Sequence, residues 1–255
     1  MISASPFFNA VRFLTVIPVP DTPDAIAPDW MARAVKYFPV VGVCVGIAAA
    51  TVYMIAAYLW GPVIAGIAAV TTSIALTGAM HEDGIADTFD SFGGGFTVEK
   101  RLTIMKDSRI GTYGALALGI DVTLRVAVLS VLPVWIGVAA LIAAHAAARA
   151  TPGFVINNLD YSGNIEAMKV SFVETPVRAS EWQFALAVVA IAAIPLALMS
   201  PLAAIIGLVC GAIPAMLMAL WARRLIMGYT GDVLGAIEQI FEIGFLLGVL
   251  AVLRV

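Results

Sequence analysis

The sequence contains little cysteine and little charge. Of its 255 residues, only two are cysteines and 12% are Asp, Glu, Lys or Arg. Cys44 and Cys210 both lie inside apolar runs, so we expect small packing residues rather than a disulfide or a thiolate-bound metal. The formal net charge is −3, and no nucleic acid is expected as a partner.

The start of the chain lacks the pattern of a cleaved signal peptide. No basic segment precedes an apolar core, and Arg12 interrupts the apolar stretch 6–19. Residues 5–16 instead predict a short amphipathic helix that lies on the membrane interface. Its apolar residues are Phe7, Phe8, Val11, Phe13 and Leu14. Because no repeat, low-complexity segment or linker divides the chain, we expect one domain, residues 1–255.

Apolar residues dominate the composition. They make up 62% of the chain, whereas soluble domains contain roughly 45–50%. The fold class is therefore all-α, a polytopic membrane protein with about seven transmembrane helices. The apolar runs place these spans at 36–59, 63–80, 114–132, 134–150, 182–199, 202–221 and 236–253.

The basic residues indicate the orientation. All Lys and Arg residues except Arg125 and Arg254 lie in the N-terminal segment or near the three longer connections, on one side of the predicted bundle. The three opposite connections, near 60–62, 132–134 and 199–202, carry no charge. The positive-inside rule then predicts a cytoplasmic N-terminus and an external C-terminus. A polar site is expected on the cytoplasmic face of the membrane.

An acidic cluster is the most unusual feature of the chain. The ten residues from His81 to Asp90 contain four carboxylates and one imidazole. Asp83, Asp87 and Asp90 follow the spacing i, i+4 and i+7, so in a helix they share one face. A divalent cation would keep all three ionised. The alternative is a solvated acidic face, but no basic residue interleaves at i+4 to support it.

Two further polar segments are predicted on the same side. After a helix that begins near Thr97 and runs to Lys106, the cations Lys106 and Arg109 are spaced to face one anion. With a carboxylate-bound cation they would suit phosphoryl transfer; the alternative is that they anchor lipid headgroups. Residues 228–235 place Thr230 and Asp232 between glycines at the start of the last span.

Several ionisable residues lie within the predicted spans, where burial is costly and function is the default expectation. Asp121 and Arg125 are spaced i, i+4 and can neutralise one another. His145 and Arg149 have the same spacing, although Arg149 is expected to reach the interface. Glu238 and Glu242 continue at helical spacing from Asp232. The list of such residues is Asp121, Arg125, His145, Arg149, Glu238 and Glu242.

The three polar segments together resemble the cobalamin synthase family. The resemblance rests on residues 77–88 with Asp90, on 104–112 and on 230–236, and it extends to the opening segments 13–20 and 37–42. These motifs occur in the family's order along the whole chain. The sequence departs from the family pattern in the loop 161–166, which lacks the expected Arg and Gly-Leu-Gly, and at Gln239, where a glutamate is expected.

The resemblance implies an integral membrane, Mg²⁺-dependent adenosylcobinamide-GDP ribazoletransferase. Such an enzyme joins adenosylcobinamide-GDP to α-ribazole or its 5′-phosphate, releases GMP and forms adenosylcobalamin or its phosphate. The logic is similar to that of CDP-alcohol phosphotransferases, which also use a membrane-embedded aspartate cluster. Membrane lipid is a further expected partner, and association into homo-oligomers is left open.

The resemblance also implies roles for the candidate residues. Asp83, Asp87 and Asp90 are the expected Mg²⁺ ligands, and Glu82 is a weaker one. Lys106 and Arg109 are expected to neutralise the leaving group. The base is Asp232 or a carboxylate not committed to metal, such as Asp90; His81 is either a base or a brace for the ligands. The remaining substrate-binding candidates are Arg149, Thr230 and Glu242, with Glu242 favoured over Glu238.

Two other functions stay open. An ion-coupled transporter would use Asp121, Arg125, Glu238 and Glu242 to line its path, but no inverted repeat is apparent. A CDP-alcohol phosphotransferase with another substrate is the second alternative, although Asp87 stands where that family's spacing does not place it.

Overall fold

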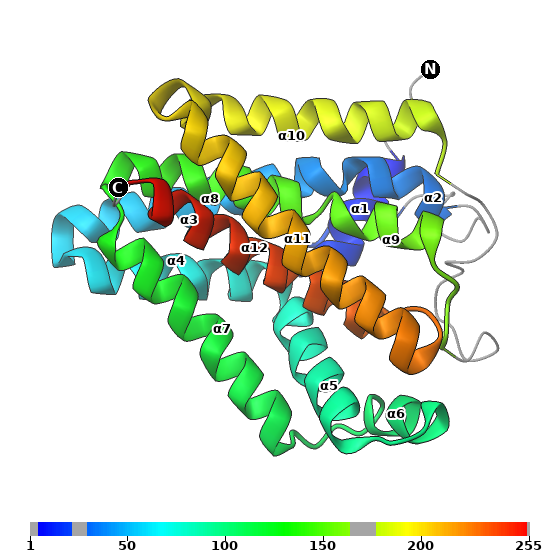
Figure 1. Ribbon diagram of the computed structural model, residues 1–255. Helices are drawn as coiled ribbons and strands as arrows, with labels where there is room; N and C mark the ends of the chain where they lie inside the picture. Colours follow the sequence, from blue (N-terminus) through cyan, green and yellow to red (C-terminus); the bar gives the residue numbers. More distant parts are fainter. Residues whose placement is uncertain (1–4, 22–29, 164–176, 254–255) are drawn as a thin grey trace.

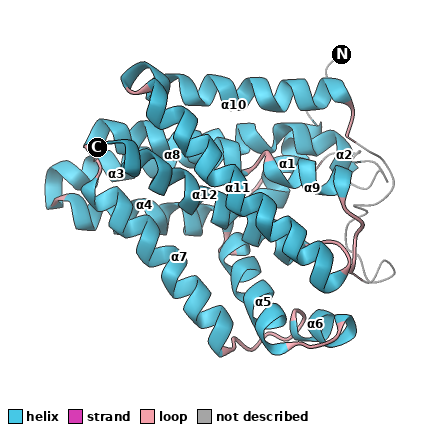
Figure 2. Cartoon of the chain, in the orientation of Figure 1, coloured by secondary structure: helices cyan, strands magenta, loops and turns pink. Residues whose placement is uncertain are grey.

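The computed structural model describes residues 5–21, 30–163 and 177–253, and all of its regular elements are helices (Figures 1 and 2). The helices are α1 (Ser5–Leu14), α2 (Trp30–Ala34), α3 (Phe38–Trp60), α4 (Pro62–Thr77), α5 (Met80–Gly94), α6 (Val98–Ile104), α7 (Thr112–Val131), α8 (Val134–Ala148), α9 (Thr151–Asn158), α10 (Ala179–Met199), α11 (Pro201–Ile226) and α12 (Gly231–Leu253). The all-α prediction is therefore confirmed.

Six helical segments are long and apolar enough to cross a membrane. They are Trp30–Trp60, Thr112–Val131, Val134–Asn158, Ala179–Met199, Pro201–Ile226 and Gly231–Leu253. Together α4 and α5 are also long and apolar enough to cross a membrane, but the chain bends by 90° between them. They make a seventh span if they are counted as one broken helix. The predicted number of about seven is thus confirmed, and the chain is a multi-pass membrane protein.

The second predicted span, 63–80, is not one straight helix. Gly78 and Ala79 adopt left-handed backbone conformations, with φ of 64° and 59°, and they end α4. The turn redirects the chain by 90° into α5. A left-handed conformation is costly for alanine, and here it lies at the point where the chain passes from an apolar helix to the acidic one.

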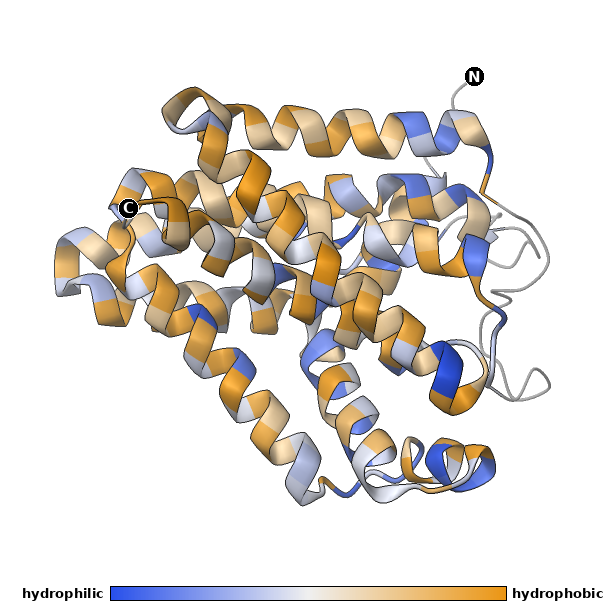
Figure 3. Ribbon diagram, in the orientation of Figure 1, coloured by the Kyte–Doolittle hydropathy of each residue, from blue (hydrophilic) through white to orange (hydrophobic). Residues whose placement is uncertain are grey.

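The bundle has two different ends. Figure 1 shows the α3–α4, α7–α8 and α10–α11 turns at one end, where α12 also finishes, while α1, α2, α9 and the α11–α12 connection lie at the other. In Figure 3 the spanning helices are mainly apolar, and polar colour gathers on α5, α6 and the helix ends near them. This separation matches the predicted grouping of short uncharged turns on one side and polar segments on the other.

Small residues let the spanning helices approach closely. A Cβ added to Gly46 of α3 would lie 2.9 Å from the Cα of Ile142 in α8. A Cβ added to Gly248 of α12 would lie 2.8 Å from the Cβ of Cys210 in α11. Such contacts are typical of helix packing in membranes, where close backbone approach replaces the hydrophobic effect.

The two cysteines are free, as predicted. Cys210 packs between α11 and α12. Cys44 is exposed on α3, so the expectation that both cysteines are packing residues is wrong for Cys44. Its neighbour on the exposed surface, Ile47, is also apolar, which is typical of a helix face in contact with lipid.

The N-terminal segment forms the predicted helix, α1. Ala10, Val11 and Leu14 are its buried face, and they join a core cluster with Phe38 and Val41 of α3. The backbone N–H of Val16 donates to the carbonyl of Leu76 at 2.9 Å. This contact fixes the end of α1 beside the α4–α5 turn.

Candidate functional site

The acidic cluster is helical, but its aspartates have different surroundings. Asp83 is exposed, Asp87 is half-buried and Asp90 is buried at 8% exposure. Repulsion from Asp83, Asp232, Asp90 and Asp107 acts on Asp87. The aspartates of α5 therefore form a cluster of like charges, and Asp232 of α12 belongs to the same cluster.

The Asp90 carboxylate accepts hydrogen bonds from the backbone at the start of α7. Its Oδ2 accepts from the N–H of Gly111 at 2.6 Å, and its Oδ1 accepts from the N–H of Gly114 at 2.8 Å. Both glycines pack so closely on the carboxylate that a Cβ at either would collide with it. Asp90 thus caps α7, where unpaired N–H groups favour a negative charge. This geometry does not fit its predicted roles as metal ligand and base.

Glu82 points away from the aspartates into the bundle. Its Oε1 accepts from Arg125 at 2.9 Å and from Gln239 at 3.1 Å. Arg125 also pairs with Asp121 on α7, as its i, i+4 spacing predicts. This position does not suit the predicted role of Glu82 as a metal ligand, because its side chain is 6% exposed and bound to a guanidinium.

Arg149 and Glu242 are also inside the bundle. Arg149 Nη1 lies 3.0 Å from Glu242 Oε1, and His145 Nδ1 lies 2.6 Å from the same oxygen. Arg125 Nη1 lies 3.6 Å from Glu242 Oε2, which joins this group to Glu82 and Asp121. Arg149 is 1% exposed and Glu242 is 3% exposed. Arg149 therefore does not reach the interface, and neither residue is placed to bind substrate.

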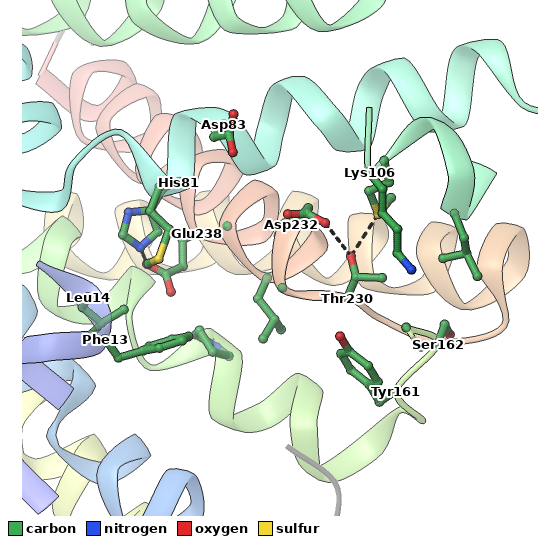
Figure 4. Close-up of a pocket in the computed structure, with 18 of the residues that line it drawn as sticks. Phe13, Leu14, His81, Asp83, Lys106, Tyr161, Ser162, Thr230, Asp232 and Glu238 are labelled. Carbon is green, nitrogen blue, oxygen red and sulfur yellow. Dashed lines mark hydrogen bonds and ion pairs between the residues drawn. The ribbon is translucent and has the colours of Figure 1, made fainter. Parts of the chain in front are cut away.

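A cavity of about 570 Å³ lies at the polar end of the bundle, and Figure 4 draws the residues that line it. They come from α1, α3, α5, α6, α9 and α12, from the segment after α9 and from the loops before α7 and α12. They are Phe13, Leu14, Phe38, Met80, His81, Asp83, Leu102, Met105, Lys106, Pro152, Tyr161, Ser162, Gly163, Thr230, Gly231, Asp232, Leu234, Gly235 and Glu238. The cavity therefore brings together four predicted site residues besides His81: Asp83, Lys106, Thr230 and Asp232.

Asp83 and Asp232 come from helices that touch at a glycine. A Cβ on Gly84 would lie 2.7 Å from the carbonyl oxygen of Asp232, so only glycine lets α5 approach the start of α12 at this point. Thr230 caps α12 by accepting from the N–H of Val233 at 3.3 Å. The α12 helix begins at Gly231, earlier than the predicted 236, and this places Asp232 in its first turn.

The two predicted phosphate-binding cations separate. Lys106 lines the cavity and points into it in Figure 4. Arg109 is exposed, and both its guanidinium and its backbone N–H donate to the Asp107 carboxylate, with Nη2 at 2.6 Å and the backbone N at 3.1 Å. The side-chain and then the backbone hydrogen bonds lower the pKa of Asp107 to about 2. Because α6 ends at Ile104, Lys106 and Arg109 do not share a helical face as predicted.

His81 pairs with Glu238 at the edge of the cavity. Its Nε2 lies 2.8 Å from Glu238 Oε2, and the same oxygen lies 4.0 Å from Arg149 Nε. The sequence favoured Glu242 over Glu238. In the structure Glu238 lines the cavity, whereas Glu242 lies one turn deeper in the bundle.

Sequence reasoning missed two kinds of cavity residue. Tyr161 and Ser162 are held against Tyr229 by backbone hydrogen bonds, including Ser162 N–H to the Tyr229 carbonyl at 2.8 Å. Burial, and to a lesser degree the charge of Asp232, raises the pKa of Tyr161. Phe13 and Phe38 are the second kind; they lie in segments that carry the family resemblance, but nothing in the sequence assigned them to a site. Residues 164–176 of the divergent loop lie outside the described residues.

The carboxylates of the cavity do not by themselves form a complete metal site. Among residues 5–21, 30–163 and 177–253, no three His, Cys, Asp or Glu side chains are grouped so that they could hold a metal ion. Asp83, Asp87 and Asp232 are the carboxylates whose position and charge fit a hard divalent cation best.

These features define a class, a multi-pass membrane protein with an acidic cavity at one end of its bundle. The model of the family described as cobalamin-5-phosphate synthase matches residues 6–250. The chain belongs to that family.

Three relatives illustrate the similarity, each named adenosylcobinamide-GDP ribazoletransferase. The protein of Leptothrix cholodnii is 39% identical over 96% of this chain and 94% of its own length. That of Bradyrhizobium diazoefficiens is 41% identical over 93% and 90%, and that of Azorhizobium caulinodans is 40% identical over 96% and 95%. No solved structure matches the chain.

Proposed function

We propose that the protein is an adenosylcobinamide-GDP ribazoletransferase. It transfers the adenosylcobinamide-phosphate group of adenosylcobinamide-GDP to α-ribazole or α-ribazole 5′-phosphate and releases GMP. Family membership over residues 6–250 is the observation that carries this proposal. The cavity supports it, because carboxylates from α5 and α12 face a lysine across a space of ligand size.

The reaction replaces the phosphoanhydride bond of the donor with a phosphodiester bond to the acceptor. A hydroxyl oxygen of the acceptor attacks the phosphorus that is attached to the corrinoid, and the bond from that phosphorus to the bridging oxygen of the diphosphate breaks. GMP leaves with that oxygen. Asp232 takes the proton of the attacking hydroxyl, and Lys106 stabilises the negative charge on the phosphates. His81 is held in place by its pair with Glu238 and supports the position of Asp83 on the same helix.

Mg²⁺ is the proposed cofactor. Mg²⁺ is commonly held by one or two carboxylates together with substrate phosphates and water, which suits a site whose protein ligands alone do not enclose a metal. Asp83 and Asp87 would hold it, with Asp232 beside them. When bound, it would neutralise charge on the diphosphate.

Purified protein in detergent tests the proposal. Incubation with adenosylcobinamide-GDP, α-ribazole and Mg²⁺ is expected to release GMP and to form one new corrinoid in equal amounts. A parallel incubation with a CDP-activated lipid and an alcohol acceptor tests the phospholipid alternative. Turnover of the second mixture alone, or of neither by folded protein, would contradict the proposal.

Lys106 and Arg109 are expected to differ in effect. Lys106→Ala removes a cation from the cavity and should lower the rate of GMP release about a hundredfold. Arg109→Ala removes an exposed partner of Asp107 and should change the rate by less than about threefold. The measurement is initial GMP release from proteins matched for folded amount; equal losses would show that Arg109 reaches the substrate.

We also propose that the cavity faces the cytoplasm of a bacterial inner membrane. The basic residues near the polar segments support this orientation. A reporter fused at Gly95 or Gly163 should be cytoplasmic, and a reporter at Gly61 or Pro201 should be external. An external signal from Gly95 would separate the site from cytoplasmic nucleotide and overturn the orientation.

A further inference from the structure

The cavity has a polar end and an apolar end. Figure 4 shows Lys106, Thr230 and Ser162 on one side, and Phe13 and Leu14 on the other. In that view Asp83 and Asp232 lie between these groups, and the His81–Glu238 pair lies beside Phe13 and Leu14. A ligand with an anionic part and an apolar part would therefore bind in one direction, with its phosphate toward Lys106.

The apolar end is a firm aromatic wall. The rings of Phe13 and Phe38 stack with centroids 5.7 Å apart and an interplanar angle of 15°. Phe38 and Leu14 are each 1% exposed, so their positions are fixed by packing. Met80, from the first turn of α5, adds a polarisable thioether, a group that packs well on aromatic rings.

We infer that this apolar end, formed by Phe13, Leu14, Phe38 and Met80, binds the aromatic base of the acceptor nucleoside. The inference rests on the proposed function and names where one of its two substrates lies. Stacking on Phe13 and contact with Met80 supply the affinity, and the ribose hydroxyl then lies near Asp232 in the middle of the cavity.

The chemistry of the wall favours the acceptor base over guanine. Guanine carries donors and acceptors on its edges, and each would need a partner when buried. Phe and Leu side chains offer no hydrogen-bonding group, and the Met sulfur is only a weak acceptor. The benzimidazole of α-ribazole is a flat, largely apolar ring system with one acceptor nitrogen and no donor, so far fewer polar groups would need a partner.

Size supports the same assignment. A volume of about 570 Å³ is in the range of pockets for drug-sized ligands, roughly 300–1,000 Å³. That space suits a nucleoside and is too small for a corrin ring with its side chains. The acceptor therefore fits inside, and the corrinoid of the donor must remain at the mouth.

Phe13→Ala and Met80→Ala test the inference from two different helices. Each should raise the KM for α-ribazole about tenfold, the effect expected when a buried apolar contact is lost. The KM for adenosylcobinamide-GDP should stay within about twofold. Phe7→Ala is the matched control, because Phe7 lies on α1 but packs on Tyr37 with centroids 6.0 Å apart, outside the cavity.

Titration calorimetry with α-ribazole alone separates this inference from the proposed function. Wild-type and Phe7→Ala proteins should bind α-ribazole, and Phe13→Ala should bind it about tenfold more weakly. Weaker binding without GMP release by the wild type would uphold the subsite and refute the activity. A normal KM for α-ribazole in both variants, a larger effect on the donor, or an equal effect of Phe7→Ala would overturn the inference.

Discussion

Asp83→Asn and Asp232→Asn are each expected to lower the rate of GMP release by at least about a hundredfold. Asn has nearly the shape of Asp but carries no charge. Both variants should fold, because each change removes like-charge repulsion in the cluster around Asp87. The two losses should differ in kind: Asp83→Asn should be partly restored by higher Mg²⁺, whereas Asp232→Asn, which lacks the base, should not.

Asp21→Asn is the matched control for this pair. Asp21 is exposed beside Arg12 and does not line the cavity, so the same chemical change there should leave the rate within about twofold. The measurement is initial GMP release against Mg²⁺ concentration for the three purified variants. Normal rates for Asp83→Asn or Asp232→Asn, or full wild-type activity in the presence of a chelator, would refute the proposed site.

Arg125→Met should destabilise the folded protein by about 3–5 kcal/mol, the usual cost of removing one partner from a buried ion pair. Arg125 is 3% exposed and contacts Glu82, Asp121 and Glu242, which come from three helices. Without it, three carboxylates remain in an apolar interior. We expect a lower yield in membranes and a lower midpoint of thermal unfolding in detergent.

Two further variants show whether charge is the cause. Arg224→Met removes an exposed arginine at the end of α11 and should leave the midpoint almost unchanged. Adding Asp121→Leu to Arg125→Met removes one of the stranded carboxylates and should recover part of the loss. An unchanged midpoint for Arg125→Met would mean that the network contributes little to stability.

Much of the fold could be predicted from the sequence. Long apolar runs are a strong signal because the bilayer requires every spanning backbone to be hydrogen-bonded internally. The broken second span was missed, since nothing in residues 63–80 announces that Ala79 adopts a left-handed conformation. The start of α12 was also missed, because Thr230 and Asp232 are polar and yet cap and begin a helix.

The sequence predicted which residue types form the site, but it did not predict in which direction each side chain points. Glu82 and Asp83 are neighbours, yet one is bound by Arg125 and the other faces the cavity. About 100° of helical rotation per residue separates them, and only the packing of α5 on α7 and α12 decides which way each points. Asp90 required even more: its capping role depends on Gly111 and Gly114, which are distant in sequence.

The short turns at the end of the bundle opposite the cavity have a consequence for how the protein is inserted into the membrane. Gly61 alone joins α3 to α4, Leu132 and Pro133 join α7 to α8, and Ser200 joins α10 to α11. Each pair can enter the bilayer as a preformed hairpin from the side that carries the polar segments, and no charged loop has to be carried across the hydrocarbon layer. Membrane insertion then reduces to three hairpins and one last helix, α12, whose arrival supplies Asp232 and Glu238 and completes the cavity.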